Sequence, residues 1–352
     1  MKILYDNIIF SWQEFGGISV VWSNLLSRII KKQAEVHILE YEGAEDYNLS
    51  RKGMNIPTQM ITKLSSHLFK IKRYLNPSSS WGNCSERFIF HSSYYRTINH
   101  PNAINITTVH DFSYELYETN WLKRKIHIWM KHRAILHSDR VVCISENTLK
   151  DLFRLLPDVP AEKVCVIYNG IDSRFHRLPN IQPQEYVLYV GKRSGYKNFE
   201  ALIEPLAILN LRIKIVGPPL TNEEKVKMKS AGLRYEFCGK VSDVGLNKLY
   251  NEAFCLFYTS LYEGFGLPVL EAQQAGCPVI ALNASSIPEV IGDQRLLIDH
   301  VSKETIEHAI KLLKNPEQRN QIIELGIRNA KRFSWDKMAE EYYDLYDSCL
   351  TK

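Results

Sequence analysis

The segment YTSLYEGFGLPVLEAQQAG, residues 258–276, decides the fold class of this chain. An apolar run ends at Tyr258, and two glycines, Gly264 and Gly266, then permit a tight turn with an open backbone. Pro268 suits the first turn of a helix, where its missing N–H costs no hydrogen bond. The closing glycine suits the left-handed residue that ends many helices. The segment therefore predicts a strand, a glycine-rich turn and a helix, in that order.

A glycine-rich turn that enters a helix at the carboxyl end of a parallel strand is a common place for a phosphate. Backbone N–H groups are free there, and the helix dipole presents its positive end. Glu263 lies in the turn and can reach sugar hydroxyls, whereas Glu271, one turn into the helix, can accept both hydroxyls of a ribose. The alternative is a solvated Glu263 and a surface Glu271. The candidate backbone contacts come from Gly264, Phe265, Gly266 and Leu267.

Apolar runs alternate with helix-length segments along the whole chain. Continuous apolar strands that alternate with helices are typical of parallel sheets covered on both faces, an α/β fold. The expected strands cover residues 3–10, 35–40, 88–91, 104–109, 140–145, 163–168, 186–191, 212–217, 235–238, 255–258, 278–282 and 296–298. The expected helices cover residues 18–31, 121–137, 198–209, 246–253, 305–313 and 335–349.

The length of 352 residues suits two domains of about 150 residues each. Residues 169–183 contain one glycine and two prolines and have no clear period, which indicates an interdomain linker. We therefore expect a first domain over residues 1–174 and a second over residues 175–334. By analogy with two-domain folds of this kind, the last segment, 335–352, is expected to pack back on the first domain.

The composition excludes several classes of protein. The hydrophobic fraction of 45% and charged fraction of 24% are those of a globular chain, and no stretch approaches the ~20 apolar residues of a membrane-spanning helix. The net charge of +5 comes without a basic stripe interleaved with aromatics, so no nucleic-acid partner is expected. Asp6 interrupts the first apolar run, which argues against a signal peptide. Seven cysteines without a C-x-x-C pair indicate a reducing, cytoplasmic setting.

The two glutamates, eight residues apart, together with residues 278–292, resemble the E-x7-E signature of retaining glycosyltransferases of family 4. The resemblance implies the GT-B fold, in which two Rossmann-like domains face each other across an interdomain cleft. It continues in YVGKRSGYKN, residues 189–198, where the family binds the donor diphosphate with an arginine and a lysine. Arg193 and Lys197 match best, and Lys192 is an alternative to Arg193. Residues 286–289 have the spacing of a helix capping box.

Weaker matches concern the rest of the donor site and the first domain. Val241 lies in a segment that resembles the loop whose backbone contacts the base. Gly16 and Gly17 stand where the family has a glycine-rich loop near the donor phosphate. His110 follows an expected strand and resembles a family histidine that faces the transferred sugar, with a purely structural histidine as the alternative. Asp111 suits a cap of the following turn.

The segment of residues 121–133 is basic and contains two tryptophans. Two interpretations fit it: a core helix whose lysines reach solvent, which we prefer, or a surface that rests on an anionic membrane. Lys70, Lys72 and Arg73 add to the second interpretation. A lipid-linked acceptor at the inner membrane face would account for both basic clusters.

The resemblance implies transfer of a hexose, with retention, from a nucleotide sugar to a glycan or a lipid-linked acceptor of a surface polysaccharide such as lipopolysaccharide. GDP-mannose is the first candidate donor, because the wording of residues 189–198 is similar to that of bacterial surface-polysaccharide mannosyltransferases, and UDP-sugars are the second. No D-x-D motif is present, so we expect no divalent metal, and no other cofactor. The alternatives are a sugar-nucleotide epimerase, a phosphorylase, and a non-catalytic nucleotide-sugar-binding protein.

Overall fold

The computed structural model of the chain describes residues 1–32, 34–77 and 84–351. It consists of two compact units: the N-terminal unit is Met1–Gly170 with Trp335–Lys352, and the C-terminal unit is Ile171–Ser334. The division falls at Gly170, whereas the sequence placed it after residue 174. Residues 171–183 accordingly belong to the C-terminal unit.

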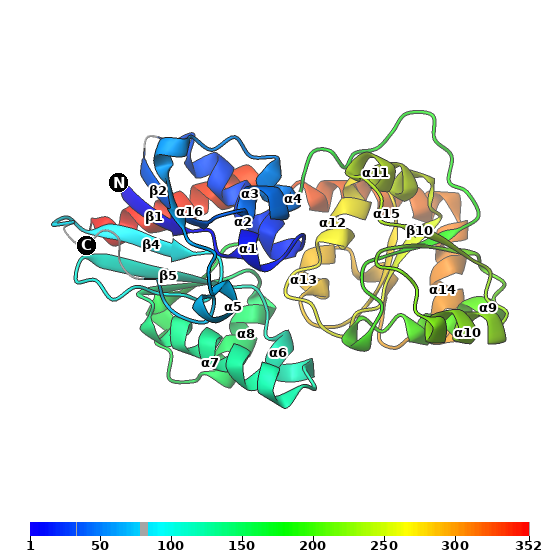
Figure 1. Cartoon of the computed structure of the whole chain (residues 1–352). Coiled ribbons are helices and arrows are strands. Elements are labelled where there is room, and N and C mark those ends of the chain that lie inside the picture. The colour runs from blue at the N-terminus through cyan, green and yellow to red at the C-terminus, as the bar shows by residue number, and fades with distance from the viewer. Residues whose placement is uncertain (33, 78–83, 352) are drawn as a thin grey trace. The chain divides into compact units, whose positions relative to one another are not determined.

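The N-terminal unit contains a seven-stranded parallel sheet with the order β3-β2-β1-β4-β5-β6-β7. Its strands are β1 (Lys2–Asp6), β2 (Glu35–Tyr41), β3 (Ile61–Leu64), β4 (Phe88–Ser92), β5 (Ala103–Val109), β6 (Arg140–Cys143) and β7 (Val164–Val166). Its α-helices are α1 (Ile9–Trp12), α2 (Gly17–Ile29), α3 (Ala44–Tyr47), α4 (Leu49–Lys52), α5 (Phe69–Lys72), α6 (Ser113–Tyr117), α7 (Trp121–His137), α8 (Glu146–Leu155) and α16 (Trp335–Leu350), and Figure 1 shows their arrangement. Two 3₁₀ turns, Thr58–Met60 and Ala161–Lys163, precede β3 and β7.

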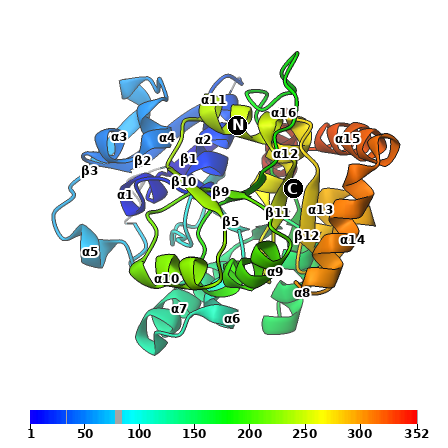
Figure 2. The same cartoon turned by 90° about the vertical axis from the view of Figure 1, so that its right-hand side faces the viewer.

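The C-terminal unit contains a six-stranded parallel sheet with the order β10-β9-β8-β11-β12-β13. Its strands are β8 (Val187–Val190), β9 (Ile213–Val216), β10 (Tyr235–Gly239), β11 (Cys255–Tyr258), β12 (Val279–Leu282) and β13 (Leu297–Ile298). Its α-helices are α9 (Ile203–Ile208), α10 (Asn222–Ser230), α11 (Asp243–Glu252), α12 (Leu267–Gln274), α13 (Ile287–Ile291), α14 (Lys303–Lys314) and α15 (Pro316–Ala330). Three 3₁₀ turns, Gly195–Lys197, Glu200–Leu202 and Gln294–Leu296, complete it. In Figures 1 and 2, α11 and α12 cover one face of this sheet, and α9 and α10 cover the other.

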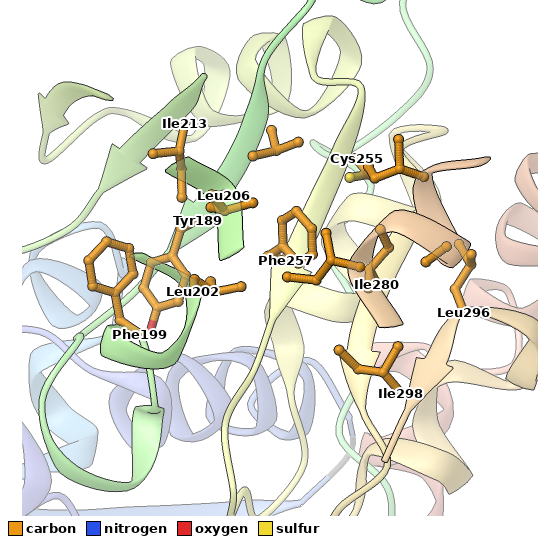
Figure 3. Close-up of a cluster of buried hydrophobic side chains, with 14 of the residues drawn as sticks. Tyr189, Phe199, Leu202, Leu206, Ile213, Cys255, Phe257, Ile280, Leu296 and Ile298 are labelled. Atoms are coloured by element: carbon orange, nitrogen blue, oxygen red, sulfur yellow. The ribbon is translucent and has the colours of Figure 1, made fainter. Parts of the chain in front are cut away.

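The strands of the C-terminal unit carry a continuous buried apolar core. Figure 3 shows side chains from β8, β9, β11 and β12 meeting those of the segment that leads into α9. Phe257 and Ile280 are fully buried, as is Leu206 of α9. Strands that are buried on both faces need this near-continuous apolar pattern, which is why the sequence predicted parallel sheets correctly.

Several expected element boundaries were wrong. The first strand ends at Asp6 instead of residue 10, because the apolar run continues into α1, and a short buried run does not distinguish strand from helix. The expected helix over 198–209 starts only at Ile203, because Asn198 adopts a left-handed φ of 56°. Strand β3 and helices α8, α10 and α15 were not expected from the sequence.

Both sheets place their first strand in the interior and grow outward from it in two directions. In the C-terminal unit the chain runs from β8 through β9 to β10 on one side, and then from β11 through β12 to β13 on the other. This is the doubly wound strand order of dinucleotide-binding folds. The order reverses between β8 and β11, and the carboxyl ends of strands at such a reversal are where doubly wound folds bind ligands.

The C-terminal helix α16 is joined to the N-terminal sheet by a buried hydrogen-bond network. Tyr346 Oη lies 2.7 Å from Nδ1 of His91, whose Nε2 lies 3.0 Å from Thr108 Oγ1. Tyr342 Oη lies 2.8 Å from the same threonine oxygen. Burial, with a contribution from the nearby His110, lowers the pKa of His91 to about 3, so its ring is neutral and both ring nitrogens need a partner.

We predict that Tyr346→Phe lowers the free energy of unfolding of the N-terminal unit by about 1–3 kcal/mol, because it leaves a buried ring nitrogen of His91 without its partner. Urea unfolding with a tryptophan fluorescence readout measures the change. Tyr47→Phe is the matched control, since Tyr47 is 49% exposed and should unfold as the wild type does. Coincident curves for Tyr346→Phe and the wild type would contradict the stabilising role of the network.

Candidate functional site

The turn between β11 and α12 has the backbone geometry that the sequence predicted. Gly266 precedes the helix with a left-handed φ of 105°, and Pro268 lies in the first turn. A Cβ atom at Gly266 would lie 2.8 Å from Cδ1 of Ile287, so a larger residue would have to displace that methyl group as well as adopt the left-handed φ. No side chain caps this helix start. Pro268 has no N–H and the Val269 amide donates to the Gly266 carbonyl at 3.0 Å, so the Leu267 amide is the N–H of the first turn that is left for an anionic ligand.

Two serines of the following loop hold this turn in place. Ser285 Oγ donates to the carbonyl oxygen of Glu263 at 2.6 Å and accepts from the Glu263 amide at 3.0 Å. Ser286 Oγ lies 3.0 Å from the same carbonyl and 2.9 Å from that of Phe265. The capping box expected over residues 286–289 is not formed, because the hydroxyl of Ser286 is already used by the turn and makes no cap bond. The serines thus fix the backbone of the candidate site.

The loops that follow β8 and β11 are joined at the point where the strand order reverses. Lys197 Nζ donates to Glu263 Oε1 at 2.6 Å, and the Leu261 amide donates to the carbonyl of Tyr196 at 2.8 Å. The side chains of Lys197 and Glu263 are 22% and 12% exposed. The alternative of a solvated Glu263 is therefore wrong. The structure brings together one predicted cation and one predicted acid.

Arg193, in the loop after β8, is held by an acid that the sequence analysis did not select. Its Nε donates to Glu224 Oε1 at 2.8 Å, and its Nη2 lies 3.2 Å from Glu224 Oε2 and 2.9 Å from the Pro219 carbonyl oxygen. The Arg193 side chain is only 4% exposed, whereas the neighbouring Lys192 is exposed. The two alternative phosphate ligands thus differ sharply in exposure to solvent.

Glu271 lies one turn into α12 and is half-buried, so the alternative of a surface Glu271 is wrong. Burial raises the pKa of Glu271 to about 7, although the hydrogen bond from Tyr250 opposes that shift. Tyr250 Oη donates to Glu271 Oε2 at 2.9 Å, and its ring is fully buried in α11. Nothing in the sequence singled out Tyr250, because a tyrosine at a helical position is typical of core packing.

The remaining predicted residues of the C-terminal unit occupy different environments. The Phe265 ring is buried against Phe333, with ring centroids 5.5 Å apart, so this residue can offer a ligand its backbone but not its ring. Gly264 and Leu267 are half-buried on either side of that phenylalanine. Val241 is half-buried between β10 and α11.

The predicted residues of the N-terminal unit lie at two carboxyl ends of its sheet. His110 follows β5 and is 8% exposed, and burial lowers its pKa to about 4, so the ring is neutral at physiological pH. Asp111 accepts from the Ser113 amide at 2.9 Å and from its hydroxyl at 2.7 Å, which is the predicted capping of the turn. Gly16 and Gly17 open α2, and a Cβ atom at Gly17 would meet nothing within 4 Å.

Two further features would bear on the site: a metal-binding cluster and a membrane-spanning helix. No group of three or more His, Cys, Asp or Glu side chains in the described ranges is placed to hold a metal ion. None of the helices described here combines the length and apolar character that a membrane crossing needs.

Comparisons with known proteins match both units. The family model "Glycosyl transferases group 1" matches residues 172–329, and the model "Glycosyltransferase Family 4" matches residues 15–175. The O-antigen chain mannosyltransferase B of Escherichia coli is 28% identical over 265 residues, which is 68% of this chain and 69% of that protein. An uncharacterized glycosyltransferase of Methanocaldococcus jannaschii is 25% identical over 99% of this chain and 98% of its own length.

Solved structures share the fold at low identity. Sucrose-phosphate synthase of Thermosynechococcus elongatus aligns with a TM-score of 0.76 at 16% identity, over 100% of this chain and 99% of that one. The Anabaena protein HepE, in complex with UDP-glucose, aligns with a TM-score of 0.69 at 17% identity, over 99% of this chain and all of that one. The two doubly wound units, the glycine-rich turn before α12 and the two family models lead to one conclusion. The chain is a glycosyltransferase of the GT-B fold that belongs to the family 4 group.

Proposed function

We propose that the chain transfers a hexose from a nucleoside diphosphate sugar, with retention of configuration, to a glycan or lipid-linked acceptor. The observation that carries this proposal is the meeting of Lys197 and Glu263 at the reversal of strand order, beside the uncapped start of α12. Arg193 lies in the loop after β8, as Lys197 does, and Glu271 lies in α12, the helix that follows Glu263. Together they offer two cations for a diphosphate and two carboxylates for hydroxyl groups.

In the proposed reaction the bond between the sugar and the diphosphate breaks while the acceptor oxygen attacks from the same face. Lys197, Arg193 and the positive end of the α12 dipole neutralise the charge that develops on the leaving diphosphate. The leaving phosphate itself receives the acceptor proton, so no protein nucleophile is assigned. Glu263 orients Lys197 and accepts a hydrogen bond from a sugar hydroxyl. No divalent metal takes part in this proposal, since two cations already face the diphosphate.

His110 has a separate role in the proposed reaction. Its neutral ring can donate one hydrogen bond and accept another, but it cannot supply a positive charge near pH 7. That is suited to a hydroxyl of the transferred sugar, because a fixed cation would oppose the positive charge that develops at the anomeric carbon. Gly16 and Gly17 would allow the start of α2 to approach the donor phosphate closely.

GDP-mannose is the donor that we propose first, and UDP-hexoses or UDP-N-acetylhexosamines come second. The support for mannose is the Escherichia coli relative at 28% identity, which is an O-antigen chain mannosyltransferase. The same name supports a role in the assembly of a surface polysaccharide.

We also propose that the N-terminal unit rests on an anionic membrane surface at the cytoplasmic face. Leu122, Trp129 and Leu136 of α7 are each at least half exposed, and their spacing of seven residues places them on one stripe of the helix. Lys125 lies on the same exposed face. The segment after α5 contacts this helix, since Arg133 Nη2 donates to Asn76 Oδ1 at 3.0 Å.

The exposed side chains around α5 extend the same surface, which we call the α5–α7 face. Leu68, Ile71 and Leu75 are more than half exposed and stand among Lys70 and Lys72. Apolar side chains flanked by lysines bind anionic interfaces through both burial and charge. A lipid-linked acceptor would then lie close to the unit that is proposed to receive it.

The donor proposal predicts nucleotide binding that depends on pH through Glu271. A carboxylate accepts from two ribose hydroxyls in charge-assisted hydrogen bonds, whereas the protonated form has lost its charge and turned one oxygen into a donor, so the form present above the pKa of about 7 binds more tightly. We expect the affinity for one nucleoside diphosphate to fall about tenfold between pH 8 and pH 6, because one pKa unit corresponds to a factor of ten. Calorimetry with GDP, UDP, ADP and their sugar conjugates, with EDTA present, measures this.

Glu271→Gln should bind the same nucleotide more weakly at pH 8 and lose the part of the pH dependence that the wild type shows beyond the titration of the nucleotide itself. Glu185→Gln, at an exposed position of the same unit, is the matched control. No binding at millimolar nucleotide would end the donor proposal. Isomerisation of the donor sugar without an acceptor would indicate an epimerase. Nucleotide-sugar binding without turnover would indicate a non-catalytic protein. Proton NMR of the transferred sugar reads its anomeric configuration.

The membrane proposal predicts that the protein sediments with vesicles that contain phosphatidylglycerol, but not with pure phosphatidylcholine, and that salt weakens the binding. The triple variant Leu122→Ser, Trp129→Ser and Leu136→Ser should bind about tenfold more weakly or worse, because it removes the apolar stripe. Val244→Ser, at a 79% exposed position of the C-terminal unit, is the control. Equal binding to both lipids, or an unaffected triple variant, would refute the proposal.

A further inference from the structure

We propose that Glu224, a residue outside the family motifs, is a positioning residue that holds Arg193 with one nitrogen, Nη1, reserved for the donor diphosphate. This inference rests on the proposed function and deepens it. Glu224 lies in α10, some distance along the chain from the loop after β8 that carries Arg193.

A guanidinium group has five N–H donors distributed over Nε, Nη1 and Nη2. Glu224 accepts from Nε at 2.8 Å and from Nη2 at 3.2 Å, and the carbonyl of Pro219 accepts from Nη2 at 2.9 Å. These three bonds use every donor of Nε and Nη2. Nη1 is buried and has no hydrogen-bond partner among the residues that the structure describes. A buried N–H pair without a partner is costly, so a ligand that accepts from it binds at an advantage.

The free nitrogen lies over the carboxyl ends of β8 and β9. A Cβ atom placed on Gly217 would be 3.5 Å from Nη1 of Arg193 and 2.3 Å from the carbonyl oxygen of Gly191. Gly191 directly follows β8 and Gly217 directly follows β9. Both glycines have positive φ angles, 129° and 149°. The two backbone segments thus approach each other closely beside Nη1, which only glycine at position 217 permits, at the edge of the sheet where doubly wound folds bind phosphates.

Glu224 is itself fixed before any ligand arrives. Its Oε2 accepts from the Thr221 amide at 2.7 Å, and Thr221 Oγ1 accepts in turn from the Glu224 amide at 3.1 Å, which forms a capping box at the start of α10. Burial alone would raise the pKa of Glu224, but the bonds from Arg193 and Thr221 outweigh that effect and lower it. The acid therefore stays ionised and keeps the guanidinium plane in one orientation, which reduces the entropy lost when a diphosphate binds.

The same contact allows an opposite interpretation, in which Glu224 competes with the diphosphate for Arg193 and must release it. The two interpretations predict opposite effects of removing the charge of Glu224. A positioning residue strengthens nucleotide binding, so its loss weakens binding. A competitor weakens nucleotide binding, so its loss would strengthen binding. The unused donors on Nη1 favour the positioning role, because Arg193 can contact a phosphate without giving up either bond to Glu224.

The test compares Glu224→Gln and Glu224→Ala with Glu223→Gln, a matched control at the adjacent position, whose side chain is 77% exposed. Calorimetry with the nucleoside diphosphate that binds the wild type, and with its unphosphorylated nucleoside, gives two affinities for each variant. We expect both Glu224 variants to bind the diphosphate about ten- to a hundredfold more weakly, and to bind the nucleoside as the wild type does. In steady-state assays, KM for the donor should rise more than kcat falls. Glu223→Gln should be unchanged.

The nucleoside measurement separates local misfolding from lost positioning, since a misfolded site would lose both ligands. Lys192→Ala supplies a second comparison and should affect the diphosphate less than Arg193→Lys does, because Lys192 is exposed and Arg193 is held. Unchanged or tighter diphosphate binding by Glu224→Gln, or equal loss of nucleoside and diphosphate, would overturn the inference while leaving the donor site intact. A wild-type protein that binds no nucleoside diphosphate would instead overturn the proposed function.

Discussion

The ion pair between Lys197 and Glu263 is the interaction on which the candidate donor site depends. It joins the loops that leave two neighbouring strands, β8 and β11, at the point where the strand order reverses. With no ligand present, each charge keeps the other compensated, so neither loop has to reorganise to reduce repulsion or desolvation. A diphosphate placed there meets a cation that is already desolvated and oriented. Preorganisation of this kind is the main way in which proteins stabilise charge that develops during a reaction.

The same principle recurs around the C-terminal sheet, with a different partner each time. Arg193 is held by Glu224, Glu271 by Tyr250, and the backbone of the Glu263 turn by two serines. Each of these partners comes from a segment that follows another strand of the sheet, so the fold must be complete before the site exists. In the N-terminal unit, burial keeps two histidines, His91 and His110, neutral. A neutral imidazole is suited to a hydroxyl group, and a cation to a phosphate.

The sequence predicted the fold class and the donor-site turn well, because both depend on local pattern. Continuous apolar runs predict buried parallel strands, and two glycines followed by a proline predict a tight turn that leads into a helix. The partners could not be predicted, since Glu224 and Tyr250 belong to helices whose sequences resemble ordinary surface and core positions. Ser286 was visible but was assigned to a helix cap, because spacing does not reveal that its hydroxyl reaches back to the turn before α12. The end of the first strand was predicted wrongly for a similar reason, because residues 8–10 are apolar and suit a buried strand and a buried helix equally.

The most direct test of the central claim is a crystal structure of the chain with the bound nucleoside diphosphate that calorimetry selects. We expect a β-phosphate oxygen within hydrogen-bond distance of both Arg193 Nη1 and Lys197 Nζ. The ribose hydroxyls should contact Glu271, and Arg193 should keep its two bonds to Glu224. A nucleotide bound elsewhere, or a diphosphate held by Lys192 while Arg193 contacts only Glu224, would contradict the claim.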